Sequence, residues 1–109
     1  MSIMTRGTTP TLTYNLGIDD ANLIKGGEVY FSQDGVLRLM KSFDDDACTI
    51  SDDGTLLVTL TQAETLRFNP EIKLETQVRI VYQNGSVEAT NIVKDRVSRI
   101  LKGGEINVD

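Results

Sequence analysis

The chain has 109 residues, a formal net charge of −5, 39% hydrophobic residues and 25% charged residues. This balance is typical of a folded domain and excludes global disorder, which requires fewer apolar groups and more net charge. The length suits a single domain, residues 1–109, built around one core.

The acidic charge lies in the first half of the chain. Residues 1–55 contain four basic and nine acidic residues, whereas residues 56–109 contain seven of each. An acidic domain repels phosphate backbones, so we expect no nucleic-acid partner. No window approaches the ~20 apolar residues of a membrane span. The start has no signal-peptide core, so we expect neither a signal peptide nor membrane association.

The sequence contains no histidine and a single cysteine, Cys48. Histidine is the commonest general base and transition-metal ligand, so its absence argues against an enzyme. Without a histidine to activate it, Cys48 is interpreted as a small core residue. We therefore predict no catalytic residue and no cofactor.

The first predicted strand is PTLTYNL, residues 10–16, in which apolar residues alternate with polar ones. This period of two, with threonine on the polar face, is typical of a half-exposed strand. Residues 17–27 are expected to form a connection that ends in the flexible pair Gly26-Gly27.

Two hairpins are predicted from short turn signals. Asp34-Gly35 lies between the apolar runs 28–33 and 36–43, and Asn84-Gly85 occupies a similar position further along the chain. Such dipeptides favour a type I′ turn, because both turn positions require positive φ.

The strand before Asn84 has the strongest pattern in the chain. Alternate residues from Leu74 are apolar or threonine, and the residues between them are polar. This pattern predicts a long, half-buried strand, with an inner face formed by Leu74, Thr76, Val78, Ile80 and Tyr82.

A change of period follows the predicted strand at residues 55–60. Thr61 and Glu64 have the spacing of a capping box, which predicts one helical turn. Asn69-Pro70 would end this turn. Three apolar residues are then expected to cover one end of the core: Ala63, Leu66 and Phe68.

The segment 93–101 is compatible with either a strand or a helix. Its apolar spacing suits a helix, but the preceding hairpin leads directly into it and favours a strand. The pair Gly103-Gly104 resembles Gly26-Gly27, and we interpret both pairs as turns that precede a strand.

The acidic stretch FDDDACTISDDG, residues 43–54, does not match an EF-hand, because three required positions hold Cys48, Thr49 and Thr55. We interpret it as two aspartate turns around a short strand that carries Cys48 and Ile50. An unconventional calcium site remains open if the two turns converge. Its candidate ligands are Asp44, Asp46, Asp52 and Asp53.

Taken together, about seven strands at regular intervals predict an all-β protein. Hairpin turns at this spacing are typical of an antiparallel β-sandwich. We expect an immunoglobulin-like architecture with one short helical turn and without the Cys–Trp–Cys signature of true immunoglobulin domains.

Four segments carry a family resemblance over nearly the whole chain. TRGTTPTLTYNL, GGEVYFSQDGVL, LTQAET and RILKGG resemble segments of small proteins from bacteriophages and prophages of Gram-positive bacteria. The first ~40 residues also resemble, by their strand pattern, the N-terminal domain of phage upper baseplate proteins, a β-sandwich that docks on a tail structure. These motifs are structural, so the resemblance implies no catalytic residues.

The resemblance implies a non-enzymatic tail or baseplate module that acts by protein–protein docking. Its partners would be other tail or baseplate proteins or further copies of itself in a homo-oligomer. It would be assembled in the bacterial cytoplasm and incorporated into the virion. Arg6, Thr8 and Thr9 precede the first predicted strand and are the candidate docking arm. The alternative is a carbohydrate- or calcium-binding module that recognises a host surface.

Overall fold

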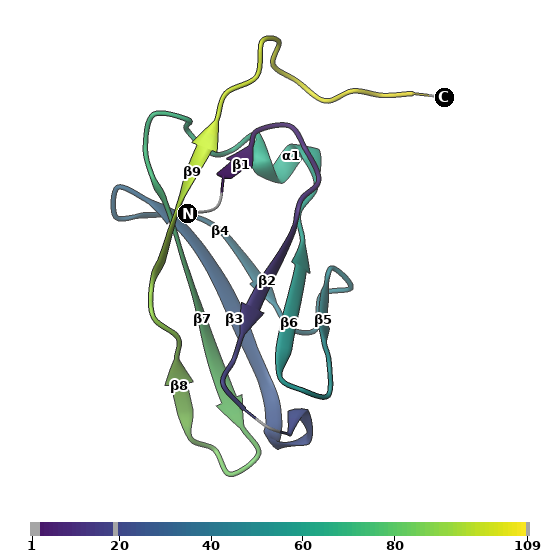
Figure 1. Ribbon diagram of the computed structural model, residues 1–109, viewed down its shortest axis with the longest axis vertical. Helices are drawn as coiled ribbons and strands as arrows, with labels where there is room; N and C mark the ends of the chain where they lie inside the picture. The colour runs from purple at the N-terminus through teal and green to yellow at the C-terminus, as the bar shows by residue number, and fades with distance from the viewer. Residues whose placement is uncertain (1–2, 19, 109) are drawn as a thin grey trace.

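The computed structural model describes residues 3–18 and 20–108, so the ends of the predicted domain 1–109 lie outside the described residues. The described residues form nine strands in two sheets, with one helix of four residues and one 3-10 turn (Figure 1). The elements are β1 (Ile3–Thr5), β2 (Thr11–Asn15), η1 (Ala21–Leu23), β3 (Ile24–Gln33), β4 (Val36–Ser42), β5 (Cys48–Ile50), β6 (Thr55–Thr59), α1 (Gln62–Thr65), β7 (Leu74–Tyr82), β8 (Val87–Ala89) and β9 (Val93–Ser98).

The six-stranded sheet has the order β1-β9-β7-β3-β4, and β8 also pairs with β7. The three-stranded sheet has the order β2-β6-β5. All strand pairs are antiparallel except β1 with β9. In immunoglobulin notation, β2-β6-β5 follows the order B-E-D, and β9-β7-β3-β4 follows the order G-F-C-C′. The predicted immunoglobulin-like sandwich is therefore confirmed.

The strand count differs from the expected seven for two reasons. β1 was not predicted, and the last predicted strand is divided into β8 and β9. Within the open segment 93–101, the strand interpretation is correct as far as Ser98. Residues 105–108 lie in neither sheet, so the expected strand after Gly103-Gly104 is wrong.

The core lies between the two sheets and confirms the predicted alternation. Leu56 and Val58 of β6 are fully buried, as are Leu74 and Val78 of β7. These side chains belong to one hydrophobic cluster that also includes Phe31. Both strands therefore bury one face against the opposite sheet, as the period of two requires.

The predicted type I′ turn is found at one hairpin only. Asp34 and Gly35 have φ values of 53° and 77°. At the second hairpin Gly85 has a φ of 88°, whereas Asn84 does not have positive φ. The Gly85 amide donates to Tyr82, and Tyr82 donates to the carbonyl of Ser86. This longer loop, with glycine in the left-handed region, replaces the two-residue turn.

The pair Gly26-Gly27 does not form a flexible turn, which corrects the prediction for residues 17–27. Both glycines belong to β3, which begins at Ile24. A Cβ atom on Gly27 would collide with the Arg79 carbonyl oxygen and the Phe43 ring. Glycine is therefore required here for close packing of the strand.

The capping box at α1 is confirmed. The Glu64 amide donates to the Thr61 hydroxyl at 3.2 Å, and the Thr61 amide donates to the Glu64 carboxylate at 2.8 Å. Phe68 is fully buried as expected, but Ala63 is exposed. Thr65 is buried instead, because the single turn presents that position to the core.

Candidate functional site

The two aspartate turns are confirmed as turn chemistry. The Asp45 carboxylate accepts from the Ala47 amide at 2.8 Å, and the Asp53 carboxylate accepts from the Thr55 amide at 3.1 Å. Hydrogen bonds from Ser51 and Thr55 lower the pKa of Asp53. These contacts are local, as expected for aspartate in turns.

The calcium candidates are not brought together. The strand β5 lies extended against β6, so it separates the two turns by about 10 Å at the usual rise per residue. Within residues 3–18 and 20–108, no three Asp, Glu, Cys or His side chains are grouped to hold a metal ion. This statement covers Asp44, Asp46, Asp52 and Asp53.

Cys48 lies at the margin of the core and packs against it. Burial raises the pKa of its thiol, and the neighbouring Asp45 carboxylate raises it further. Both effects oppose the thiolate form that a nucleophile requires. The position of Cys48 agrees with its interpretation as a small packing residue.

The candidate docking arm is held against α1. The Arg6 guanidinium donates to the Leu66 carbonyl at 2.8 Å, and the Thr65 hydroxyl donates to the Thr8 carbonyl at 2.9 Å. Arg6 is therefore half-buried and occupied in fixing the chain. Thr8 and Thr9 are exposed and line a hollow beside Gln62. A docking role for these residues stays a prediction.

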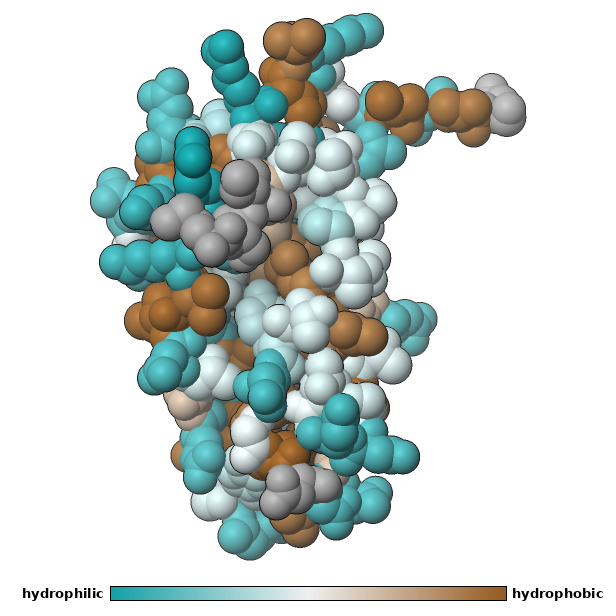
Figure 2. Space-filling view, viewed as in Figure 1, coloured by the Kyte–Doolittle hydropathy of each residue, from teal (hydrophilic) through white to brown (hydrophobic). Residues whose placement is uncertain are grey.

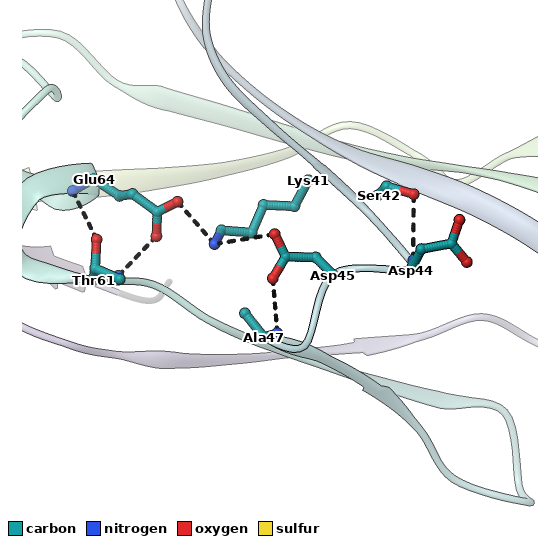
Figure 3. Close-up of polar contacts among 7 residues, drawn as sticks. All are labelled: Lys41, Ser42, Asp44, Asp45, Ala47, Thr61 and Glu64. Carbon is teal, nitrogen blue, oxygen red and sulfur yellow. Dashed lines mark hydrogen bonds and ion pairs between the residues drawn. The ribbon is translucent and has the colours of Figure 1, made fainter.

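An ion pair that the sequence analysis missed fixes α1 to the edge of the six-stranded sheet (Figure 3). Lys41 of β4 is only 6% exposed, and its ammonium lies 2.8 Å from the Glu64 carboxylate and 4.0 Å from that of Asp45. Burial opposes the charged form of Glu64, but hydrogen bonds from Lys41 and Thr61 outweigh it and lower the pKa. The period of two from Leu39 places Lys41 inward and could have revealed this contact.

The outer face of the six-stranded sheet exposes several large apolar side chains, and we call it the outer GFCC′ face. Its exposed apolar residues are Leu37 (57%), Met40 (48%), Val87 (50%) and the adjoining Ile92 (55%). Several large apolar side chains exposed on one face of a sheet are the kind of surface that interaction sites use.

A β-bulge brings Leu37 and Met40 to the same face. Met40 pairs with Tyr30, whereas Leu37 pairs with Ser32, and the register shifts between them at Arg38. Simple alternation would place residues 37 and 40 on opposite faces, so the sequence pattern does not predict this site. The extra residue of a bulge reverses the phase of the strand.

Tyr30 lies at the centre of the outer GFCC′ face, between two hollows. It lines one hollow of about 320 Å³ together with Val81 and Val87, and a second of about 170 Å³ together with Leu37 and Ile92. The Arg79 guanidinium lies 6.0 Å from the centroid of its ring. The Tyr30 hydroxyl donates to the Glu28 carboxylate at 2.7 Å. A fixed aromatic side chain beside apolar hollows is typical of a protein-binding hot spot.

Solved structures with a similar fold are immunoglobulin-like domains. A strand-swapped dimer of the immunoglobulin-like domain of mouse leukocyte-associated immunoglobulin-like receptor 1 is 16% identical, with 87% of this chain and 84% of that chain covered and a TM-score of 0.49. A chicken TCR is 11% identical, with 90% and 46% covered and a TM-score of 0.49. The V domain of amphioxus IgVJ-C2 is 9% identical, with 88% and 98% covered and a TM-score of 0.37.

No protein-family model and no curated protein sequence matches this chain. The immunoglobulin-like assignment rests on the strand order of the two sheets, and many domains with this architecture bind other proteins. None of the helices in the described part of the chain is long and apolar enough to cross a membrane.

Proposed function

We propose that this protein is a non-enzymatic docking module that binds another protein through its outer GFCC′ face. The observation that carries the proposal is the exposed apolar surface around Tyr30, which includes Leu37, Met40 and Val87. Charged side chains beside Tyr30, such as Arg79 and Glu28, would orient the partner. The absence of histidine from the sequence supports a binding role over a catalytic one.

The proposed setting is the tail or baseplate of a bacteriophage or prophage. The support is the resemblance of the segments TRGTTPTLTYNL and LTQAET to small proteins of phages from Gram-positive bacteria. The partner would be a neighbouring tail or baseplate protein, met during assembly in the bacterial cytoplasm and retained in the virion. A compact sandwich that exposes large apolar side chains on one face suits such a permanent contact.

The test is to mix the purified protein with each tail protein encoded beside it, followed by size-exclusion chromatography with light scattering. We expect a complex that Leu37→Asp weakens by at least about tenfold, because burying an unpaired charge removes a hot-spot contact. The matched control is Thr13→Asp, an exposed position on the three-stranded sheet. Equal binding by the two variants, or no complex with any neighbour, would contradict the proposal.

A further inference from the structure

The C-terminal segment 105–108 projects from the body of the protein beyond α1 (Figure 1). Apolar side chains are visible along it (Figure 2). Ile106 is 72% exposed and Val108 is 87% exposed, although both residues also line the hollow beside α1. Alternate exposed apolar residues on a chain outside any sheet are the pattern of a segment that binds another surface.

The side chain of Gln62 binds the backbone of this segment. Its side-chain oxygen accepts from the Ile106 amide at 2.8 Å, and its side-chain nitrogen donates to the Ile106 carbonyl at 3.2 Å. A primary amide carries one acceptor and two donors, so it can pair with a peptide unit as a neighbouring strand would. The contact recognises an extended backbone.

The surface around Gln62 is rigidly built. The hollow has a volume of about 410 Å³ and is lined on one side by Gly7, Thr8 and Thr9. Thr8 is held by the Thr65 hydroxyl at 2.9 Å. The other residues that line the hollow are Gln62 of α1 and the segment's own Ile106 and Val108. The capping box and the ion pair with Lys41 fix α1 in place. A preorganised groove loses little entropy when it receives an extended peptide.

The segment is joined to β9 by a hinge. Residues 99–104 carry no regular structure and include Gly103 and Gly104, of which Gly104 has a φ of 93°. A small backbone rotation at Gly103-Gly104 would redirect residues 105–108 without changing the structure of β9 or the extended conformation of the segment. Exchange of an identical element between copies needs such a hinge.

We propose that residues 105–108 form an exchange arm, which binds the groove between Gly7–Thr9 and Gln62 of a second copy. The groove already recognises this segment, so the exchanged arm keeps the Gln62 contact. In the chain's own groove Ile106 and Val108 remain largely exposed. Because the exchanged contact with the groove is the same, these side chains become covered where the bodies of the two copies meet around the arms. The arm and its groove share no residue with the outer GFCC′ face. This proposal therefore stands independently of the proposed function.

The first experiment measures oligomeric state against concentration by light scattering. We expect wild-type dimers, and at least about tenfold weaker dimerisation for Ile106→Asp, because a charge would enter the covered surface. Gln62→Ala should weaken the dimer in the same way. The control is Leu101→Asp, a fully exposed apolar position of the hinge that lines no part of the groove. It should dimerise like the wild type.

The second experiment mixes Gln62→Ala protein, which keeps an intact arm, with Ile106→Asp protein, which keeps an intact groove. One complete arm–groove contact is restored only in the mixed dimer, so mixed dimers should exceed the statistical proportion. Thermal unfolding confirms that each variant is folded. A folded wild-type protein that stays monomeric at all concentrations would overturn the proposal, as would dimers that Ile106→Asp leaves unchanged.

Discussion

The two sheets of the sandwich distribute polarity in opposite ways. The three-stranded sheet buries Leu56 and Val58 and exposes threonine, with the Thr11 and Thr59 hydroxyls 3.0 Å apart across β2 and β6. This is the ordinary pattern of a sheet with one solvated face. Figure 2 shows the polar surface over β2 and β6 as mostly white and teal.

The six-stranded sheet departs from this pattern on both faces. Its inner face buries polar and charged side chains, and its outer GFCC′ face exposes Leu37 and Met40. Gln33 makes two hydrogen bonds to the carbonyls of Asn69 and Ile72, and it accepts a third from the Asn69 amide. The buried polar residues of this sheet are Gln33, Lys41, Thr76 and Asp95.

This difference indicates that the two sheets have different roles in the protein. Buried polar groups are tolerated when specific partners satisfy them. Lys41 connects the sheet to α1 through Glu64. Gln33 connects it to the turn before β7 through the Asn69 carbonyl. Local departures from the hydrophobic pattern cluster where a protein positions or presents a binding surface. The three-stranded sheet supplies core packing, and the six-stranded sheet also supplies the candidate binding surface.

The largest expected change in the free energy of unfolding concerns the three-stranded sheet. Leu56→Ala should lower the free energy of unfolding by about 3 kcal/mol, because it leaves a cavity in the shared core. Leu57→Ala, at the next position on the outer face, should cost less than about 1 kcal/mol. Chemical denaturation measures both. Similar losses at the two positions would show that β6 does not have one inner and one outer face.

The second effect tests the buried ion pair of the six-stranded sheet. Lys41→Met should lower the free energy of unfolding by about 2 kcal/mol, because it leaves the Glu64 carboxylate without its partner. The double variant Lys41→Met/Glu64→Gln should recover part of this loss. Urea denaturation of the single and double variants measures the coupling, and an additive result would contradict it.

The ion pair also predicts an acid dependence. The pKa of Glu64 is lowered in the folded protein from an ordinary value of 4.5. Its contribution is therefore fully present above pH 4.5 and is lost as the pH falls through the folded pKa. The stability difference between wild type and Glu64→Gln should shrink below pH 4.5 in denaturation curves. A difference that persists into stronger acid would contradict the assignment.

A smaller effect is expected at alkaline pH from Tyr14, whose side chain packs between the sheets. Burial raises its pKa to about 12, a hydrogen bond with Thr76 opposes the shift, and the Asp95 carboxylate adds to it. In the unfolded chain the Tyr14 hydroxyl would ionise near pH 10. Its contribution to the free energy of unfolding is therefore fully present below pH 10 and is lost as the pH rises to about 12.

A shift of about two pKa units corresponds to at most about 3 kcal/mol. Tyr14 is only half-buried, so solvent screening lowers the expected loss to about 2 kcal/mol or less. Wild-type stability should therefore fall more steeply between pH 10 and 12 than that of Tyr14→Phe. Tyr30 and Tyr82 remain in both proteins and cancel in the comparison. Parallel pH profiles would show that Tyr14 ionises as freely in the folded protein as in the unfolded chain.

The smallest expected effect concerns the outer faces themselves. Leu37→Thr and Thr13→Leu should each change the free energy of unfolding by less than about 0.5 kcal/mol, because both positions are exposed. Binding of a hydrophobic dye should nevertheless fall with Leu37→Thr and rise with Thr13→Leu. Equal dye binding by both variants would remove the distinction between the two faces.

The sequence predicted features that depend on neighbours in the chain. The alternation in β7, the type I′ turn at Asp34-Gly35 and the capping box at Thr61 are each specified by a few adjacent residues. The aspartate turns around β5 belong to the same group, because an aspartate carboxylate bonds amides two residues away.

Features that depend on distant residues were missed. The bulge at Arg38 reverses the phase of β4 and brings Leu37 and Met40 to the candidate docking face. Gly27 lies in β3 because this strand pairs with β7, and it is glycine because Arg79 and Phe43 approach it closely. Neither pairing register nor close approach is written in a local pattern.

The sequence by itself determined an all-β protein with alternating strands, hairpins and one capped turn, since these follow from local backbone and side-chain chemistry. The tertiary structure alone decided which polar residues are buried and which apolar residues are exposed. Lys41 is buried because Glu64, distant in the chain, neutralises it. Ile106 is held by Gln62 because α1 presents that amide to the C-terminal segment. Such contacts depend on strand register and packing, which only the folded chain fixes.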